Sequence, residues 1–219
     1  MLPPKIVQLS QEIHAVDPLS QSIAYNYDTW CNHLYPYEEL DYIYSVFPNK
    51  ISRGNIVALS KEAVETCDIG DIRKLFLATM IWGYGTTGYG PWRTAEMFST
   101  RNFSYMIENA FNLVLRNRIL DAYTQFNIKR CGPPYFTKYL YFIGYGAGLD
   151  LYPLILDTRV WEALRDRVEI DTTLFVKKST WWYPEGYLRY VRTMHHWAAT
   201  LNCEAHNIEY LLFKLGRLN

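Results

Sequence analysis

The sequence has no long apolar run, no clustered cysteines and no excess of charge of either sign. Its apolar stretches fall short of the roughly 18 to 20 residues of a membrane-spanning helix. The segment from Met1 to Lys5 has no apolar signal-peptide region. We therefore expect a cytoplasmic, monomeric protein without membrane contact.

The sequence contains no motif that indicates a bound metal or cofactor. The cysteines (Cys31, Cys67, Cys131 and Cys203) form no C-x-x-C pair and have no zinc-ligand spacing with histidines. A P-loop, a dinucleotide fingerprint and a Gly-x-Ser-x-Gly elbow are missing. We expect reduced, mostly buried thiols, as in cytosolic proteins, and neither a metal nor a cofactor.

Charge is balanced overall but unevenly distributed. Lys and Arg number 22, as do Asp and Glu, so no global positive field attracts nucleic acid. Residues 1–70 nevertheless carry a net charge of −5, residues 71–219 carry +5, and residues 110–140 alone carry +4. A solvated helix face and an anion-binding surface explain this last cluster equally well.

Length, apolar content and aromatic side chains are abundant. The 219 residues are 49% apolar, enough for the core of one domain spanning residues 1–219. The 19 Tyr and 7 Trp exceed what a core usually needs, which hints at stacking on a ligand. Apolar residues recur with helical spacing nearly throughout, and no run alternates as a strand does. This pattern predicts an all-α fold.

A glycine-rich break separates two predicted helices. Ser60 is predicted to cap one helix, and the apolar face that follows through Ile72 and Met80 stops at Gly83. Pro91 opens the next helix. The four glycines within residues 82–90 predict a tight loop whose backbone comes close to another group.

The next segment predicts two helices joined by a hairpin. One helix starts at Ile119, and the segment Lys129–Pro134 cannot continue it but can begin another, which runs to Gly146. In this helix-hairpin-helix, about residues 119–143, the amides at the start of the second helix would face an anion such as a phosphate. Further helices are predicted at residues 107–115, from Thr158 past Leu164, at 186–201 and at 204–216, while residues before 50 show no clear pattern.

Two segments after the hairpin carry a specific pattern. They are Gly132-Pro133-Pro134-Tyr135-Phe136-Thr137-Lys138 and Leu154-Ile155-Leu156-Asp157-Thr158-Arg159-Val160-Trp161. On this pattern the chain resembles the 8-oxoguanine DNA glycosylase branch of the helix-hairpin-helix glycosylase superfamily, from about Ile72 to Leu164 and again at Glu209–Phe213. It looks like a short bacterial member without the N-terminal β-domain, and its hairpin lacks the family's second glycine.

The resemblance implies a reaction. In that family a Thr-Lys pair supplies a nucleophilic amine, here Lys138, which would attack C1′ of the target nucleotide and form a Schiff base once the base has left. The attack requires a neutral fraction of the amine, which burial or neighbouring cations favour. Asp157 would stabilise positive charge on the sugar and orient or deprotonate the attacking group. Taken alone, Lys138 also suits a surface lysine and Asp157 an ordinary N-cap.

The resemblance also suggests how DNA is held. A glycosylase extrudes its target nucleotide and fills the gap, and relatives place gap-filling residues near the loop from Gly83 to Gly90. The candidate DNA-binding residues are Gly132, Pro134, Thr137, Lys129, Arg130, Tyr84, Gly85 and Thr86. The candidate walls of a base pocket are Trp82, Tyr89, Trp182, His195 and His196, although such residues on helices more often belong to the core.

Three functions remain open. Short bacterial proteins of this branch resemble those of antiphage loci, which favours excision of a hypermodified phage base such as glucosylated 5-hydroxymethylcytosine, leaving an abasic site, with partner proteins from the same locus. The first alternative is an 8-oxoguanine repair glycosylase, with or without strand cleavage. The second is a non-catalytic nucleic-acid-binding accessory protein of a defence complex.

Overall fold

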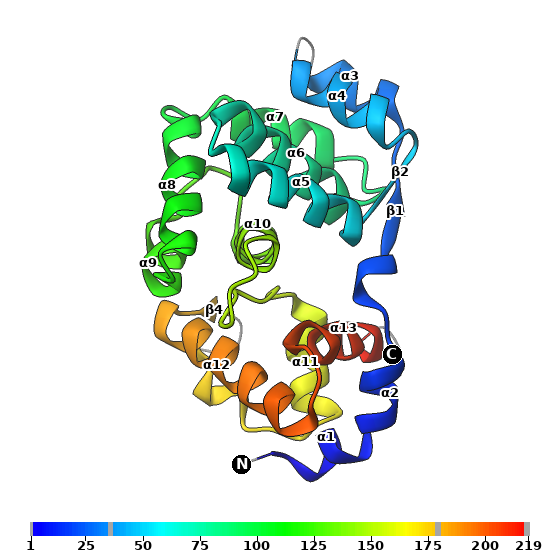
Figure 1. The fold of residues 1–219 in the computed structure, drawn as a ribbon, viewed down its shortest axis with the longest axis vertical. Helices are drawn as coiled ribbons and strands as arrows, with labels where there is room; N and C mark the ends of the chain where they lie inside the picture. Colours follow the sequence, from blue (N-terminus) through cyan, green and yellow to red (C-terminus); the bar gives the residue numbers. More distant parts are fainter. Residues whose placement is uncertain (1, 35–36, 178–180, 217–219) are drawn as a thin grey trace. The chain divides into compact units, whose positions relative to one another are not determined.

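The chain was analysed as a computed structural model, which describes residues 2–34, 37–177 and 181–216. These residues are mostly helical, which confirms the all-α prediction (Figure 1). The chain divides into two compact units. Unit 1 is formed by residues 1–18 and 153–219, and unit 2 by residues 19–152. Unit 2 is thus inserted into unit 1, and the single domain expected from the sequence stays a prediction.

Unit 2 is built around one central helix. Its elements are β1 (Ser22–Ala24), α3 (Tyr27–Leu34), α4 (Glu38–Val46), β2 (Lys50–Ser52), α5 (Arg53–Thr66), α6 (Ile69–Tyr84), α7 (Gly90–Phe98), α8 (Phe103–Leu115), α9 (Ile119–Gln125) and α10 (Pro133–Gly146). The last of these, α10, packs against α5, α6 and α8 (Figure 1). Its residues from Phe136 to Gly144 are all buried, so every face of the helix contributes to the core.

The start of α5 corrects one prediction. Ser60 does not cap a helix: it lies buried inside α5, and its hydroxyl donates to the carbonyl oxygen of Phe142 at 2.7 Å. The cap is Ser52, whose side chain accepts from the Asn55 amide in a capping box. The helix therefore begins eight residues earlier than predicted, and its buried apolar residues Ile56, Leu59 and Ala63 have helical spacing.

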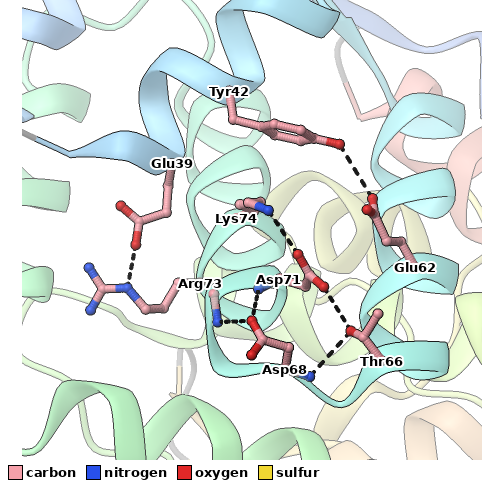
Figure 2. Close-up of polar contacts among 9 residues, drawn as sticks. Glu39, Tyr42, Glu62, Thr66, Asp68, Asp71, Arg73 and Lys74 are labelled. Carbon is pink, nitrogen blue, oxygen red and sulfur yellow. Dashed lines mark hydrogen bonds and ion pairs between the residues drawn. The ribbon is translucent and has the colours of Figure 1, made fainter.

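Charged side chains cap the start of α6, pair within its first half and join it to α4. Asp68 caps the helix through its carboxylate, and Asp71 accepts a hydrogen bond from Lys74 at 2.8 Å (Figure 2). This bond with Lys74 is the main reason that the pKa of Asp71 is lowered. Arg73 of α6 pairs with Glu39 of α4. The other half of α6 is apolar and reaches the hairpin region.

Unit 1 is also helical, with one short strand pair. Its elements are α1 (Pro4–Gln8), α2 (Ser10–Ala15), α11 (Thr158–Asp166), β3 (Val176–Lys177), β4 (Trp181–Trp182), α12 (Pro184–Leu201) and α13 (Ala205–Leu215), with single 3-10 turns at Pro18–Ser20, where the units meet in the chain, and Thr172–Leu174. The Asn207 amide donates to carbonyl oxygens of Ile13 and Val16 at 3.3 and 3.4 Å, so the two parts of unit 1 are joined.

The strands were not predicted. β1 pairs with β2, and β3 with β4, both antiparallel. Each strand is two or three residues long, too short to show alternation. By contrast, the helices predicted around Ile72, Pro91, Ile107 and Ile119, and those after the hairpin and Asp157, are confirmed as α6 to α13. Within the described ranges no helix combines the length and apolarity that crossing a membrane requires.

Candidate active site

Lys138 is a buried amine on the central helix of unit 2. Only 6% of the residue is exposed. Its Nζ donates to the carbonyl oxygen of Pro134, one turn earlier, and lies 5.6 Å from the ring centre of Tyr135. This environment therefore differs from that of a surface lysine, which was the alternative interpretation of Lys138 from the sequence alone.

Gly83 leaves room for the Lys138 side chain. A Cβ built at this position of α6 would lie 3.2 Å from Cδ of Lys138 and 3.7 Å from its Cε. The same Cβ would lie 3.7 Å from the Tyr135 ring. The missing side chain thus lets the lysine stem run across the end of α6. Sequence reasoning placed Gly83 at a helix stop and in a loop that comes close to another group, whereas α6 continues to Tyr84.

An aromatic stack borders the lysine. The rings of Tyr135 and Tyr84 stack with centres 4.2 Å apart, and Tyr89 meets Tyr84 edge-on. Tyr84 is buried, and burial raises the pKa of its hydroxyl, which therefore stays neutral. Sequence reasoning placed Tyr84 in a DNA-binding loop, but the structure places it as the last residue of α6. It did not single out Tyr135, although this residue lies three positions before Lys138 and so on the same helix face.

Cys131 lies close to the amine and is the one cysteine of the four that is fully buried. Burial raises the pKa of its thiol, and the charge of Lys138 acts in the opposite direction. Cys31 and Cys203 are half-buried and Cys67 is exposed, so the prediction of mostly buried thiols is wrong. All four cysteines are free thiols.

The start of α10 offers fewer amides than the hairpin motif suggested. Pro133 and Pro134 occupy its first two positions and have no N–H. The amides of Tyr135 and Phe136 both donate to the carbonyl oxygen of Gly132. A phosphate at this helix start would therefore depend on the Gly132 N–H and on side chains, which corrects the expectation of several outward-facing amides. Thr137 is buried, and its hydroxyl donates to the carbonyl oxygen of Pro133.

The two cations of the hairpin loop share one carboxylate. Arg130 Nε donates to Glu96 of α7 at 2.8 Å, and Lys129 Nζ lies 3.5 Å from the same carboxylate. These bonds, that of Arg130 first, lower the pKa of Glu96. The Arg130 guanidinium also lies 5.1 Å from the ring centre of Trp92, which is exposed. A phosphate would have to compete with Glu96 for both cations.

The glycine-rich loop between α6 and α7 lines a small cavity. Gly85 has φ +59°, a left-handed conformation that glycine adopts readily. The cavity has a volume of about 300 Å³ and is lined by the loop residues Gly85, Thr86, Thr87 and Gly88, by Pro91, and by Ala24, Tyr25, Asn26, Thr29 and Trp30. The cavity thus lies between the loop and the segment formed by β1 and α3, within unit 2.

Asp157 begins a helix in unit 1. Its Oδ1 accepts from the amide of Arg159 at 3.0 Å, which confirms the predicted N-cap of α11. The preceding segment is held by buried tyrosines that sequence reasoning did not single out: the hydroxyls of Tyr187 and Tyr190 donate to the carbonyl oxygens of Leu154 and Ile155. The Asp157 side chain is half-exposed at the end of a buried segment.

The predicted base-pocket residues have diverse environments. Trp82 is buried in unit 2, and its indole N–H donates to the carbonyl oxygen of Gln21 at 3.1 Å. Tyr89 is 48% exposed at the start of α7. In unit 1, His195 is half-buried, whereas His196 lines a cavity of about 690 Å³. The Trp182 backbone lies in β4, but its side chain is outside the described part of the structure.

Metal ligands do not cluster in the part of the chain that the structure describes. Among these residues, no group of three or more His, Cys, Asp or Glu side chains is placed to hold an ion. The chemistry on offer is that of a buried amine, a capping carboxylate and aromatic rings. Such groups suit nucleophilic and acid–base steps.

The hairpin, the lysine on its second helix and the following aspartate are the features on which the sequence resembles helix-hairpin-helix DNA glycosylases. The family model described as "Putative 8-oxoguanine DNA glycosylase OGG-like protein" matches residues 16–213, and the chain belongs to this family. Membership supports a DNA glycosylase with DNA as the substrate, and it confirms the resemblance seen in the sequence. Neither the curated proteins nor the solved structures contain a match.

Proposed function

We propose that the protein excises a modified base from DNA, with Lys138 as the nucleophile and Asp157 as its catalytic partner. The observation that carries the proposal is the burial of Lys138, 6% exposed, beside a glycine that leaves space for its side chain. Lysine is almost never fully buried unless its amine is paired, and here the amine donates to a backbone carbonyl oxygen. Family membership supplies the reaction to which this amine is assigned.

In the proposed reaction the neutral amine of Lys138 forms a bond to C1′ while the glycosidic bond breaks, and the base leaves with the electron pair and takes up a proton from water. The attached nitrogen then loses a proton to the Asp157 carboxylate. The C1′–O4′ bond breaks as the nitrogen forms a double bond to C1′, and O4′ takes up the proton from Asp157, which gives a protonated Schiff base. Its hydrolysis leaves an abasic site and returns the amine. Asp157 also stabilises the positive charge that develops on the sugar.

For the substrate we propose a hypermodified phage base such as glucosylated 5-hydroxymethylcytosine, with a role in antiphage defence. The richness in tyrosine and tryptophan supports this choice, because aromatic faces stack on sugars as well as on bases. The second candidate is 8-oxoguanine, which the family description favours. A non-catalytic accessory role is opposed by the presence of both Lys138 and Asp157.

The first experiment offers three duplexes, carrying unmodified, 8-oxoguanine and glucosylated 5-hydroxymethylcytosine bases. Abasic sites and borohydride-trapped adducts are measured on each. Excision of one of the two modified bases identifies the substrate and also distinguishes antiphage defence from DNA repair. DNA binding without abasic sites on any duplex would favour the accessory role.

The second experiment tests the roles of the two residues. Lys138→Gln is expected to abolish borohydride trapping, because no amine remains to form the adduct. Asp157→Asn is expected to lower excision by several orders of magnitude. Because Asn caps a helix as well as Asp does, Asp157→Asn should keep its free energy of unfolding, and urea unfolding of both variants checks this. Trapping that persists in Lys138→Gln would refute the assignment.

A further inference from the structure

Unit 1 contains a larger cavity, which neither the hairpin nor Asp157 lines. It has a volume of about 690 Å³ and follows α12, the orange helix of Figure 1. Its apolar walls are Pro3, Ile170, Phe175, Leu188 and Trp197, and its polar side is Glu185, Arg189, Arg192, Thr193 and His196. A cavity of this size holds a ligand of several hundred daltons or a segment of a polymer.

The polar side forms a ridge on one face of α12. Arg189, Arg192, Thr193 and His196 are spaced at i, i+3, i+4 and i+7, so they follow one another along the helix surface. The ridge spans about 10 Å at the 1.5 Å rise of an α-helix. Arg189, Arg192 and His196 are exposed. Two guanidinium groups and an imidazole thus face the opening of an apolar groove.

We propose that this ridge binds the sugar–phosphate backbone of duplex DNA. Guanidinium groups bind phosphates through paired N–H donors, and the Thr193 hydroxyl adds a further donor. The aliphatic walls offered by Leu188 and Ile170 suit the apolar faces of deoxyribose. Glu185 would repel a phosphate, so it limits the binding surface to the part of α12 from Arg189 onwards.

The ligand follows from the proposed function, since a glycosylase must hold long DNA while one nucleotide is extruded. The hairpin alone offers little for this purpose: prolines replace two of its amides, and Glu96 occupies its two cations. With a net charge of zero, the chain has no general attraction for DNA. A local cationic ridge on a second surface supplies what the hairpin lacks.

The test measures binding of a fluorescent, unmodified duplex by anisotropy between 50 and 200 mM salt. The double variant Arg189→Ala/Arg192→Ala is expected to bind roughly tenfold more weakly, and the slope of log affinity against log salt is expected to fall by about 2. The matched control is Arg165→Ala/Arg167→Ala in the last turn and C-cap of α11. It removes the same charge from exposed positions of the same unit that do not line the cavity.

Each outcome decides. A loss of affinity and slope confined to the ridge variant supports the inference, whereas equal behaviour of the two double variants, or no binding by the unaltered protein, overturns it. An acidic peptide would then be the better occupant of the groove. Binding is measured on unmodified DNA and does not depend on excision. If the unaltered protein excised no base but its DNA binding still depended on the ridge, the proposed reaction would be refuted and this inference would stand.

Discussion

Lys138 is an ionisable side chain in the middle of an apolar helix, and its neighbours show how the fold accommodates it. Its aliphatic stem lies against Gly83, while the amine reaches the Pro134 carbonyl and the Tyr135 ring. The motif itself contains Pro134 and Tyr135, but the contact with Gly83 was not predicted. The glycine-rich segment was expected to approach another group, and only the fold identifies that group as Lys138.

Substitution of Gly83 tests whether the position of the Lys138 amine controls the reaction. A Cβ at 3.2 Å from the Lys138 stem must displace it by a few tenths of an ångström. Gly83→Ala is therefore expected to lower the rate of borohydride trapping roughly tenfold, because small misplacements of a reacting group are costly. Stability should change little, since alanine favours the helix by about 1 kcal/mol and the tight contact offsets this gain.

Urea unfolding separates the two effects. An active-site role for Gly83 is supported if trapping falls while the free energy of unfolding is retained. Trapping at the rate of the unaltered protein would show that the amine tolerates the displacement, and a large loss of stability would assign Gly83 to packing alone.

Glu96 restrains the hairpin cations, and its removal is expected to increase DNA affinity. In Glu96→Gln, Lys129 and Arg130 lose their carboxylate partner and become available to phosphates. We expect unmodified duplex to bind several-fold more tightly, with a steeper salt dependence. The control is Glu65→Gln, which removes one charge from an exposed position on α5. An equal gain in both variants would reveal a net-charge effect instead of a local one.

At the scale of elements, the sequence predicts helices well where apolar spacing is regular and poorly where it is not. The helices from α6 to α13 have such spacing, and prolines mark the start of α7 and α10. The elements before residue 50 are short and half-exposed, so few of their residues must be apolar. Ser60 was assigned wrongly because a buried serine bonded to another helix looks, in sequence, like a cap.

Close packing of α5 and α10 depends on Gly146. A Cβ there would lie 2.2 Å from Ser60 Oγ and 2.6 Å from its Cβ. Gly146→Ala is therefore expected to destabilise the protein by about 2 kcal/mol in urea unfolding, as overpacking typically does. Gly88→Ala is the control, since a Cβ there meets no atom within 4 Å.

A double-mutant cycle identifies the cause. Ser60→Gly removes both close contacts, so adding Gly146→Ala to that variant should cost far less than it does alone, with a coupling energy of at least about 1 kcal/mol. Additive effects would mean that Gly146 is needed for its own backbone and that the approach to Ser60 is incidental.

For the whole molecule, the insertion of unit 2 into unit 1 links their stabilities. The two parts of unit 1, residues 1–18 and 153–219, are joined by the chain of unit 2. If that chain unfolds, closing it as a loop costs unit 1 about 4 kcal/mol by loop-closure entropy. This is a large share of a typical domain's stability. No local pattern in the sequence shows such a linkage, because it arises from chain topology.

We therefore expect both units to unfold in one transition. Cys131 reports on unit 2 and Cys203 on unit 1, and exposed Cys67 serves as the labelling control. In urea, pulse alkylation followed by peptide mapping should show Cys131 and Cys203 becoming reactive with the same midpoint, while Cys67 reacts throughout. If Cys131 reacted at a urea concentration where Cys203 remained protected, unit 1 would be stable while unit 2 was unfolded. The loop-closure argument would then be wrong.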